Sequence, residues 1–260
     1  GPRESPRDDG AALHGPVYVE GAEPGDVIEV HVEEVRPADF GWTWAGGAGF
    51  KNTALNEALG VAEVDAIILR WALDPDGGTA TSELGHVVTL RPFLGMIGLC
   101  PDEAGWASPW PPRRVGGNMD CRELYAGAVL ELPVEVPGGL VSVGDGHAAQ
   151  GDGEIAGTAI ECPMDRVVLR YELRKDRPVA GPRVRNPEGW ATLGFGESLD
   201  TAVAGALNGM LDLVQELYSL DRVTALAVAS PVVDMRLTQL VNGVRGVHAF
   251  LRHDAIRPSR

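Results

Sequence analysis

Residues 17–35, VYVEGAEPGDVIEVHVEEV, contain the pattern that decides the fold class. Two runs rich in β-branched residues flank a turn at residues 24–26, where Pro, Gly and Asp follow one another. In the second run, apolar side chains alternate with polar ones. The apolar members are Ile28, Val30 and Val32, and the polar members are Glu29, His31 and Glu33. This period of two predicts a β-strand with one face buried and the other face in water.

Similar short runs continue along the chain, separated by Gly and Pro. We expect further strands at residues 66–71, 87–90, 128–136, 140–143, 155–160 and 166–173. Two segments are expected to lack long elements: residues 36–60, with the glycine-rich GWTWAGGAGF, and residues 91–120, which are rich in Pro and Gly. Short strands joined by tight turns predict a sandwich or a barrel rather than a βαβ succession.

The clearest helix pattern lies at residues 200–218. Apolar side chains recur there at steps of three and four, at Val203, Leu207, Met210, Leu211, Val214 and Leu217. Ser198 or Asp200 can cap the start of this helix. A second helix is expected from Asp221 to residue 229, before Pro231. The predicted fold class is therefore mainly β, a sandwich with one or two helices in the C-terminal half.

The charge balance argues against two classes of partner. The chain has 37 acidic and 22 basic residues and a net charge of −15. Such a surface repels nucleic-acid phosphates and anionic membranes, so we expect neither partner. No apolar run approaches the ~18 residues that a transmembrane helix needs. The three cysteines are an odd, sparse set, which argues against a disulfide framework and for a reducing compartment.

Domain organisation is expected to be simple. Residues 1–13 are predicted to form a flexible lead-in because they begin with ten polar and charged positions. Residues 14–260 are predicted to form one catalytic region, as a single unit or as two closely packed β subdomains. Because the first residue is not Met, we expect that the N-terminus has been processed or that a segment of it is missing.

Acidic residues and one histidine gather in residues 144–154, GDGHAAQGDGE, downstream of GGNMD at residues 116–120. Their polar members are Asp145, His147, Gln150, Asp152 and Glu154. Glycine permits positive φ, so the glycines between them let the chain turn several short side chains inward. Carboxylates with one imidazole are a typical ligand set for Zn²⁺ or another divalent cation.

Two other interpretations of this segment stay open. It can be a solvated acidic turn, because Asp and Gly both favour β-turns. It can also be the structural Ca²⁺ site of a non-catalytic β-sandwich, because carboxylate-rich loops suit Ca²⁺ as well as zinc. His147 discriminates between the two metals, since imidazole is a good Zn²⁺ ligand and a poor Ca²⁺ ligand.

Three long motif blocks run through the middle of the chain. They are RPFLGMIGLCPDEAG at 91–105, PPRRVGGNMDCREL at 111–124 and LPVEVPGGLVSVGDGHAAQGDGEIAGTAIE at 132–161. Shorter blocks flank them: GPVYVEGAEPGD at 15–26, FGWT at 40–43 and VVDMRLTQLVNGVRGVHAFL at 232–251. In this order the blocks resemble the acetamidase/formamidase family. The resemblance implies a jelly-roll-like sandwich in a cytoplasmic homo-oligomer, and hydrolysis of formamide or acetamide to ammonium and the carboxylate. A relative that acts on a different C–N bond is an alternative.

The resemblance also implies a divalent metal, with zinc as the first choice; Ca²⁺ stays the alternative because of the carboxylate-rich segment. The expected metal ligands are Asp120, His147, Glu154 and Asp145. The expected catalytic carboxyl groups are Asp120, Glu154 and Glu161. The expected substrate-pocket residues are Asn118, Gln150, Trp42 and His14.

A cysteine nucleophile is the main rival mechanism for an amidase. Nitrilase-type amidases pair Cys with Glu and Lys, but the two lysines of this chain, Lys51 and Lys175, are far in sequence from the glycine-rich segment. We therefore interpret Cys100, Cys121 and Cys162 as small buried hydrophobes. A serine mechanism is disfavoured because the sequence has no GxSxG motif.

Overall fold

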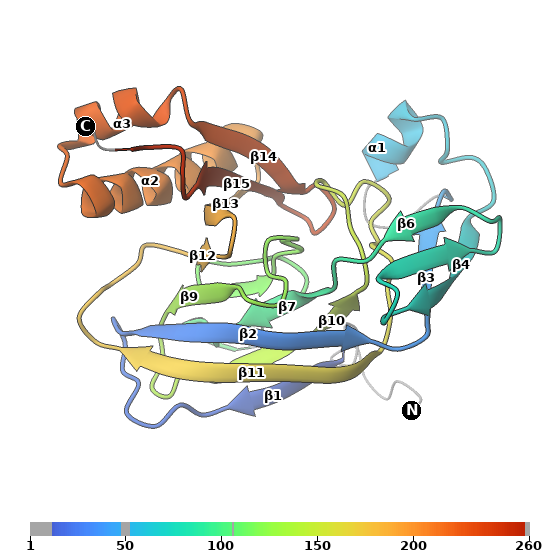
Figure 1. Cartoon of the computed structure of the whole chain (residues 1–260), viewed down its shortest axis with the longest axis horizontal. Coiled ribbons are helices and arrows are strands. Elements are labelled where there is room, and N and C mark those ends of the chain that lie inside the picture. The colour runs from blue at the N-terminus through green and yellow to red at the C-terminus, as the bar shows by residue number, and fades with distance from the viewer. Residues whose placement is uncertain (1–11, 48–52, 106, 258–260) are drawn as a thin grey trace.

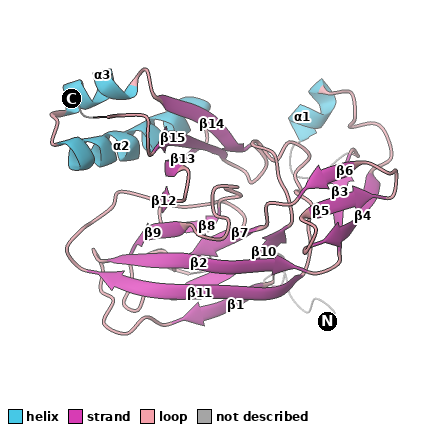
Figure 2. Cartoon of the chain, in the orientation of Figure 1, coloured by secondary structure: helices cyan, strands magenta, loops and turns pink. Residues whose placement is uncertain are grey.

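The computed structural model describes residues 12–47, 53–105 and 107–257. Antiparallel strands form three sheets, and two helices cover one end of the molecule (Figures 1 and 2). The predicted mainly β fold class is therefore confirmed. Residues 1–11 of the expected lead-in lie outside the described residues, and Leu13 already begins strand β1.

The largest sheet has seven strands in the order β11-β2-β9-β12-β13-β15-β14, and all neighbours are antiparallel. Its strands are β2 (Val27–Pro37), β9 (Val129–Pro133), β11 (Met164–Arg174), β12 (Arg183–Arg185), β13 (Gly189–Gly196), β14 (Val233–Gln239) and β15 (Arg245–Arg252). A second sheet has the order β1-β10-β7-β8. Its strands are β1 (Leu13–Val17), β7 (Phe93–Gly98), β8 (Gly116–Asn118) and β10 (Val141–His147).

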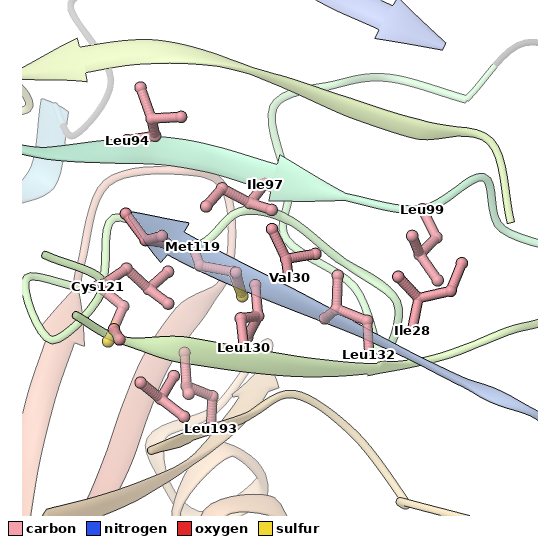
Figure 3. Packing of buried hydrophobic residues seen from close by; sticks show 14 of the residues in the cluster. Ile28, Val30, Leu94, Ile97, Leu99, Met119, Cys121, Leu130, Leu132 and Leu193 are labelled. Atoms are coloured by element: carbon pink, nitrogen blue, oxygen red, sulfur yellow. The ribbon is translucent and has the colours of Figure 1, made fainter. Parts of the chain in front are cut away.

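The main core lies between these two sheets. The apolar residues of β2, Ile28, Val30 and Val32, are at most 1% exposed, as their alternation predicts. They pack against side chains of β7 and β9, among them Ile97 and Leu130 (Figure 3). Every residue of β7 is buried, because this strand lies in the middle of its sheet and carries the core on one face.

Both predicted helices are present. Helix α2 (Leu199–Tyr218) begins at the N-cap Ser198, whose hydroxyl accepts a hydrogen bond from the Thr201 backbone N–H. Helix α3 (Arg222–Ala229) begins at the N-cap Asp221. The apolar stripe of α2 packs on β13 and β15, where it covers the half of the large sheet that lies away from β2.

The third sheet has the order β3-β4-β5-β6 and corrects one prediction. Its strands are β3 (Phe40–Ala45), β4 (Ile67–Asp74), β5 (Thr79–Ser82) and β6 (Val87–Thr89). Residues 36–60 were expected to be irregular, yet they contain β3 and the short helix α1 (Thr53–Ala58). A β-carbon at Gly41 would lie 2.7 Å from Ile160 Cγ2, so the glycine that suggested a loop instead permits close approach of two strand-like segments.

Two further expectations are wrong. The segment at residues 155–160 is a turn region and not a strand, because its backbone closes on itself through Gly157 N–H to the Glu154 carbonyl, 2.8 Å. Asp145 and His147 were expected in a loop, but both lie on β10, which pairs with β7. Among the described helices, none is long and apolar enough to cross a membrane.

Candidate active site

Two groups of possible metal ligands overlap at His147. One joins Asp120, His147 and Glu154, and the other joins Asp145, His147 and Glu161; in each, one ligand atom per residue lies within 4.8 Å of the others. His147, Asp120 and Glu154 are at most 3% exposed, whereas Asp145 and Glu161 keep 21% and 15% of their side chains exposed. The structure therefore brings together all five predicted metal-binding and catalytic side chains, and solvent reaches them from the side of Asp145 and Glu161.

Strand pairing places His147 at the centre of this cluster. His147 lies opposite Phe93 of β7 on one side and opposite Glu161 on the other. Residues directly opposite in antiparallel strands point to the same face, and the rings of Phe93 and His147 meet edge to face with centroids 5.0 Å apart. The packed ring holds the imidazole, and its Nε2 lies 3.4 Å from Asp145 Oδ2 and 3.4 Å from Glu161 Oε2.

The electrostatics of the cluster favour a positive charge at this point. Burial alone lowers the pKa of His147, but the carboxylates of Glu161 and Asp145 outweigh burial and raise the pKa well above its ordinary value. Buried carboxylates are costly unless a cation or hydrogen-bond donors face them. A divalent cation bound by the same side chains would supply this charge.

Gly95 of β7 leaves the space that such a cation needs. A β-carbon at this position would lie 2.6 Å from Asp120 Oδ1, 2.6 Å from Asp145 Oδ2 and 2.8 Å from His147 Cε1. Three candidate ligand side chains therefore converge on one point above the Gly95 backbone. Oxygen donors with one imidazole are the set that zinc and related divalent ions accept. On these grounds the residues fit a divalent metal, and the central imidazole favours zinc over Ca²⁺.

Three of these carboxylates have unusual backbone conformations. Asp120, Asp145 and Glu154 have φ angles of 49°, 62° and 45°. Only two other described non-glycine residues, Leu140 and Ser219, have positive φ. Few residues other than Gly, Asn and Asp adopt this region, and conformations of this kind gather at functional sites, where surrounding contacts impose them. The surrounding fold therefore aims these three side chains at a cost in backbone energy.

Asp120 is fixed by contacts from three parts of the chain. Backbone N–H groups of Met119 and Asp120 both donate to the Gly95 carbonyl, at 3.0 and 3.1 Å. The Gln150 side chain donates to the Asp120 carbonyl at 2.7 Å, and the Asn242 side chain donates to Asp120 Oδ2. These bonds connect Asp120 to β7, to the segment after β10 and to the β14–β15 turn, and the Asn242 bond is the one that reaches the carboxylate.

The β14–β15 turn also holds the segment that carries Glu154. Gly153 N–H donates to the Thr238 carbonyl at 3.1 Å, and Leu240 N–H donates to the Gly153 carbonyl at 3.1 Å. Gln239, which is fully buried, accepts from the backbone N–H groups of residues 241 and 242 at 2.8 and 3.1 Å and so shapes the turn.

The predicted pocket residues take different places. Gln150 touches Asp120, and Asn118 is buried at the end of β8, two residues before Asp120. His14 lies on β1 outside the ligand cluster, but together with Asp145 it lines a hollow of about 670 Å³. Trp42 pairs with Glu161 through two backbone hydrogen bonds of 2.9 Å. It lines a second hollow of about 820 Å³ on the open face of the third sheet.

Sequence reasoning missed Gly95, Gln239 and Asn242. Gly95 lies inside the block RPFLGMIGLCPDEAG, and the other two lie inside VVDMRLTQLVNGVRGVHAFL, so both blocks signalled their regions but not these residues. Asn242-Gly243 is a turn signal by its composition. Only the folded chain shows that this turn contacts Asp120, which is 122 residues away.

A third acidic group with a histidine lies on the outer face of the large sheet. Glu29, His31 and Glu172 come within ligand distance of one another. Arg170 donates to His31 Nδ1 at 2.9 Å and pairs with Glu172, so a cation already faces this cluster. We interpret this group as a surface ion-pair network.

Two of the three cysteines, Cys121 and Cys162, are poorly suited to act as nucleophiles. Cys121 is fully buried, and burial raises the pKa of its thiol far above the ordinary range. Burial also raises the pKa of the Cys162 thiol to about 12. A thiol, and not the nucleophilic thiolate, is therefore present at neutral pH in both. All three cysteines are free, as the sequence predicts, but Cys100 is only partly buried, so the expectation of a buried side chain is wrong there.

Fold and site together describe a β-rich protein with a buried acidic cluster around one histidine. A family model described as the Acetamidase/Formamidase family matches residues 103–189. Over these residues the chain is similar to that family, which agrees with the resemblance of its motif blocks.

Two curated relatives and one solved structure illustrate the similarity. The chain is 26% identical over 210 residues to an acetamidase of Mycolicibacterium smegmatis, and 31% identical over 189 residues to a formamidase of Methylophilus methylotrophus. These matches cover 55% of this chain and 48% and 46% of the two relatives, so the chain spans about half the length of the curated relatives it matches. A crystal structure of an acetamidase from Bacillus halodurans superposes with a TM-score of 0.83 at 29% identity, covering 92% of this chain and 78% of that chain.

Proposed function

We propose that this protein is an amidase that hydrolyses formamide or acetamide with a divalent metal, most simply zinc. The convergence of Asp120, Asp145 and His147 on the point above Gly95 is the observation that carries the proposal. The names of the relatives support amide hydrolysis, and the donor set supports the metal. The reaction consumes one water, breaks the C–N bond and forms a C–O bond, giving the carboxylate and ammonium.

Asp120, His147 and Glu154 would hold the metal, with Asp145 as a further ligand. When bound, the metal would polarise the amide carbonyl and lower the pKa of a bound water towards ~7. The protein contributes a rigid arrangement, because β7, β10 and the β14–β15 turn each fix one of the ligands. Such preorganisation lets the site act without rearranging during the reaction.

Glu161 is the carboxylate best placed for proton transfer. Its Oε1 accepts a hydrogen bond from the Ala159 N–H at 3.0 Å, which holds the group still, while Oε2 faces the His147 ring. Its partial exposure gives it access to water and substrate. We propose that it takes a proton from the attacking water and returns it to the departing nitrogen, a shuttle worth ~10²–10⁴-fold in rate. Burial raises the pKa of Asp152, but Asp152 belongs to neither ligand group around His147.

The setting of the enzyme is part of the same proposal. We infer a cytoplasmic homo-oligomer: the free cysteines suit a reducing compartment, and the edge strand β14 leaves Met235 and Leu237 about 40% exposed. Light scattering on the purified protein tests the oligomer, and a monomer at micromolar concentration would contradict it.

The decisive experiment measures ammonia release and metal content on one sample. Purified protein is given formamide, acetamide and propionamide, with and without a chelator and after metal is restored. We expect turnover that the chelator abolishes and zinc restores. If metal is bound but no ammonia is released, the proposed reaction is rejected and the metal site stands. If Ca²⁺ is the only metal that binds tightly, a non-catalytic β-sandwich is favoured.

His147→Ala and His31→Ala form a matched pair for locating the metal. We expect His147→Ala to lose metal and turnover, because it removes the residue shared by both ligand groups. His31→Ala removes the histidine of the outer cluster and should keep both. Metal loss in the second variant alone would place the metal on the outer face.

A further inference from the structure

Two side-chain amides present their nitrogen atoms to Asp120. Asn242 donates to the carboxylate oxygen Oδ2, and Gln150 donates to the backbone carbonyl at 2.7 Å. A carboxylate and a carbonyl can only accept, so the nitrogen of each amide must face Asp120. The amide oxygens, Asn242 Oδ1 and Gln150 Oε1, are therefore not used in the hydrogen bonds to Asp120.

These oxygens are buried acceptors without a donor. Within the described residues, neither Asn242 Oδ1 nor Gln150 Oε1 has a hydrogen-bond partner, and both atoms are inaccessible to solvent. The side-chain oxygen of Asn118, two residues before Asp120, is also buried and without a hydrogen-bond partner in the described part of the chain. Buried polar atoms are nearly always paired, so unpaired acceptors of this kind require an explanation.

Asn186 shows the usual arrangement of a buried amide in this protein. It is 3% exposed, like Asn242, but both ends of its side chain are used. Its nitrogen donates to Glu123 Oε2 at 2.8 Å, and its oxygen accepts from the backbone N–H groups of residues 188 and 189 at 2.9 Å each. A buried amide in this protein can therefore use both ends of its side chain, and Asn242, which donates to Asp120, uses only its nitrogen among the residues described.

The turn that carries Asn242 is rigid and borders a hollow. The side-chain oxygen of Gln239 accepts a hydrogen bond from the backbone N–H of Asn242 at 3.1 Å, which fixes the backbone that carries the Asn242 side chain. Asn242 also lines a hollow of about 500 Å³ beside Trp110 and Gly243. Asn242 therefore combines a buried acceptor, unpaired within the described chain, with a position beside a hollow, and a buried acceptor of this kind is suited to pair with a donor from a ligand.

We infer that Asn242 and Gln150 form the subsite for the amide nitrogen of the substrate. Their oxygens accept the two N–H bonds of a primary amide and, after cleavage, N–H bonds of the ammonium product. The inference rests on the proposed function and names its substrate class: primary amides with an unsubstituted –NH₂ group. Methyl esters present no N–H donor, so they leave both buried oxygens unpaired. Sites built to bind an N–H strongly reject analogues that lack it.

Binding and turnover of acetamide and methyl acetate test this subsite. The two probes share an acyl group and differ in their N–H donors. Dissociation constants come from ligand-observed NMR titration of the zinc-loaded protein, and the zinc content of every variant is measured alongside. The variants are Asn242→Leu, Gln150→Met and, as the matched control, Asn186→Leu, which removes a buried amide away from Asp120.

We expect Asn242→Leu and Gln150→Met each to weaken acetamide binding by roughly 10- to 100-fold and methyl acetate binding by less than about 3-fold. Asn186→Leu should leave the ratio of the two dissociation constants unchanged. Gln150→Met keeps the test available if the buried Asn242 variant fails to fold.

Equal weakening of both probes would show a purely structural role and would overturn the inference. So would a wild-type protein that binds acetamide no better than methyl acetate. Selective acetamide binding without ammonia release would reject the proposed reaction while the nitrogen subsite stands. The two proposals can therefore fail separately.

Discussion

The α-carbon of Gly95 faces Asp120 so closely that a β-carbon there would lie 2.6 Å from the carboxylate oxygen Oδ1. The same added atom would also crowd Asp145 and His147. A glycine on a fully buried central strand therefore sets the space in which three candidate ligands meet. The backbone of Gly95 also helps to position Asp120, because its carbonyl accepts hydrogen bonds from the N–H groups of Met119 and Asp120.

Gly95→Ala should therefore empty the metal site while the fold survives. The methyl group displaces Asp120 and Asp145, and we expect metal affinity to fall at least ~10-fold, with a stability loss of about 1–3 kcal/mol from overpacking. Metal titration and thermal unfolding measure the two effects. Gly151→Ala is the control, because a β-carbon there has no atom within 4 Å. Unchanged metal affinity in Gly95→Ala would contradict the position assigned to the metal.

Trp42→Ala should change the preference among acyl groups. Trp42 lies opposite Glu161, so the two side chains share a face, and Trp42 lines the 820 Å³ hollow with Phe40 and Ile68. We take Trp42 as the proposed contact for the acyl group. We expect kcat/KM for propionamide to fall more than kcat/KM for formamide, by roughly 10-fold per lost apolar contact. Trp190→Phe, on β13, is the control and should leave the ratio unchanged. A uniform loss on both amides would show that Trp42 only supports the sheet.

Acid should destabilise the protein through His248. Burial, and then the charges of Arg236 and Arg122, lower the pKa of His248 to about 3 from its ordinary 6.5. The unfolded chain therefore takes up a proton as the pH falls below 6.5, while the folded chain does not until the pH approaches 3. The free energy of unfolding therefore falls as the pH drops from 6.5 towards 3. Between pH 8 and pH 5, His248 accounts for a loss of ~2 kcal/mol.

Urea unfolding of wild type and His248→Gln at both pH values measures this contribution. The wild type should lose more stability than the variant between pH 8 and pH 5, because the variant has no group to protonate at this position. Equal losses in the two proteins would show that His248 does not contribute.

Cys121→Ala should leave the turnover of a primary amide within about 3-fold of wild type. The side chain is fully buried in the main core, and its thiol is protonated at neutral pH. Loss of the sulfur removes packing and should cost about 1 kcal/mol of unfolding free energy. A loss of turnover by ~10³-fold, with folding intact, would revive the cysteine mechanism.

The sequence was sufficient for the features that depend on local periodicity. The alternation from Ile28 to Glu33 predicted β2, because a strand that buries one face must alternate. The stripe of residues 200–218 predicted α2 together with its Ser198 cap. These patterns are local, so a single chain displays them without its tertiary contacts.

Glycine-rich segments were harder to interpret, since glycine has two opposite uses. It breaks strands where nothing packs against it, and it permits strands to approach where another backbone is close. Gly41 and Gly95 are of the second kind, so β3 appeared irregular from the sequence and the role of β7 stayed hidden. The same ambiguity explains why Asp145 and His147 were expected in a loop instead of on β10.

The acidic residues and His147 could be selected from composition and motif blocks, but their convergence depends on long-range pairing. Register between β10, β7 and Glu161 sets where His147 points, and left-handed φ angles aim Asp120, Asp145 and Glu154. Asn242 joins Asp120 across 122 residues, through a turn that only strands β14 and β15 create. Contacts of this kind follow from the closing of the whole chain, because no local pattern specifies which distant turn meets which carboxylate.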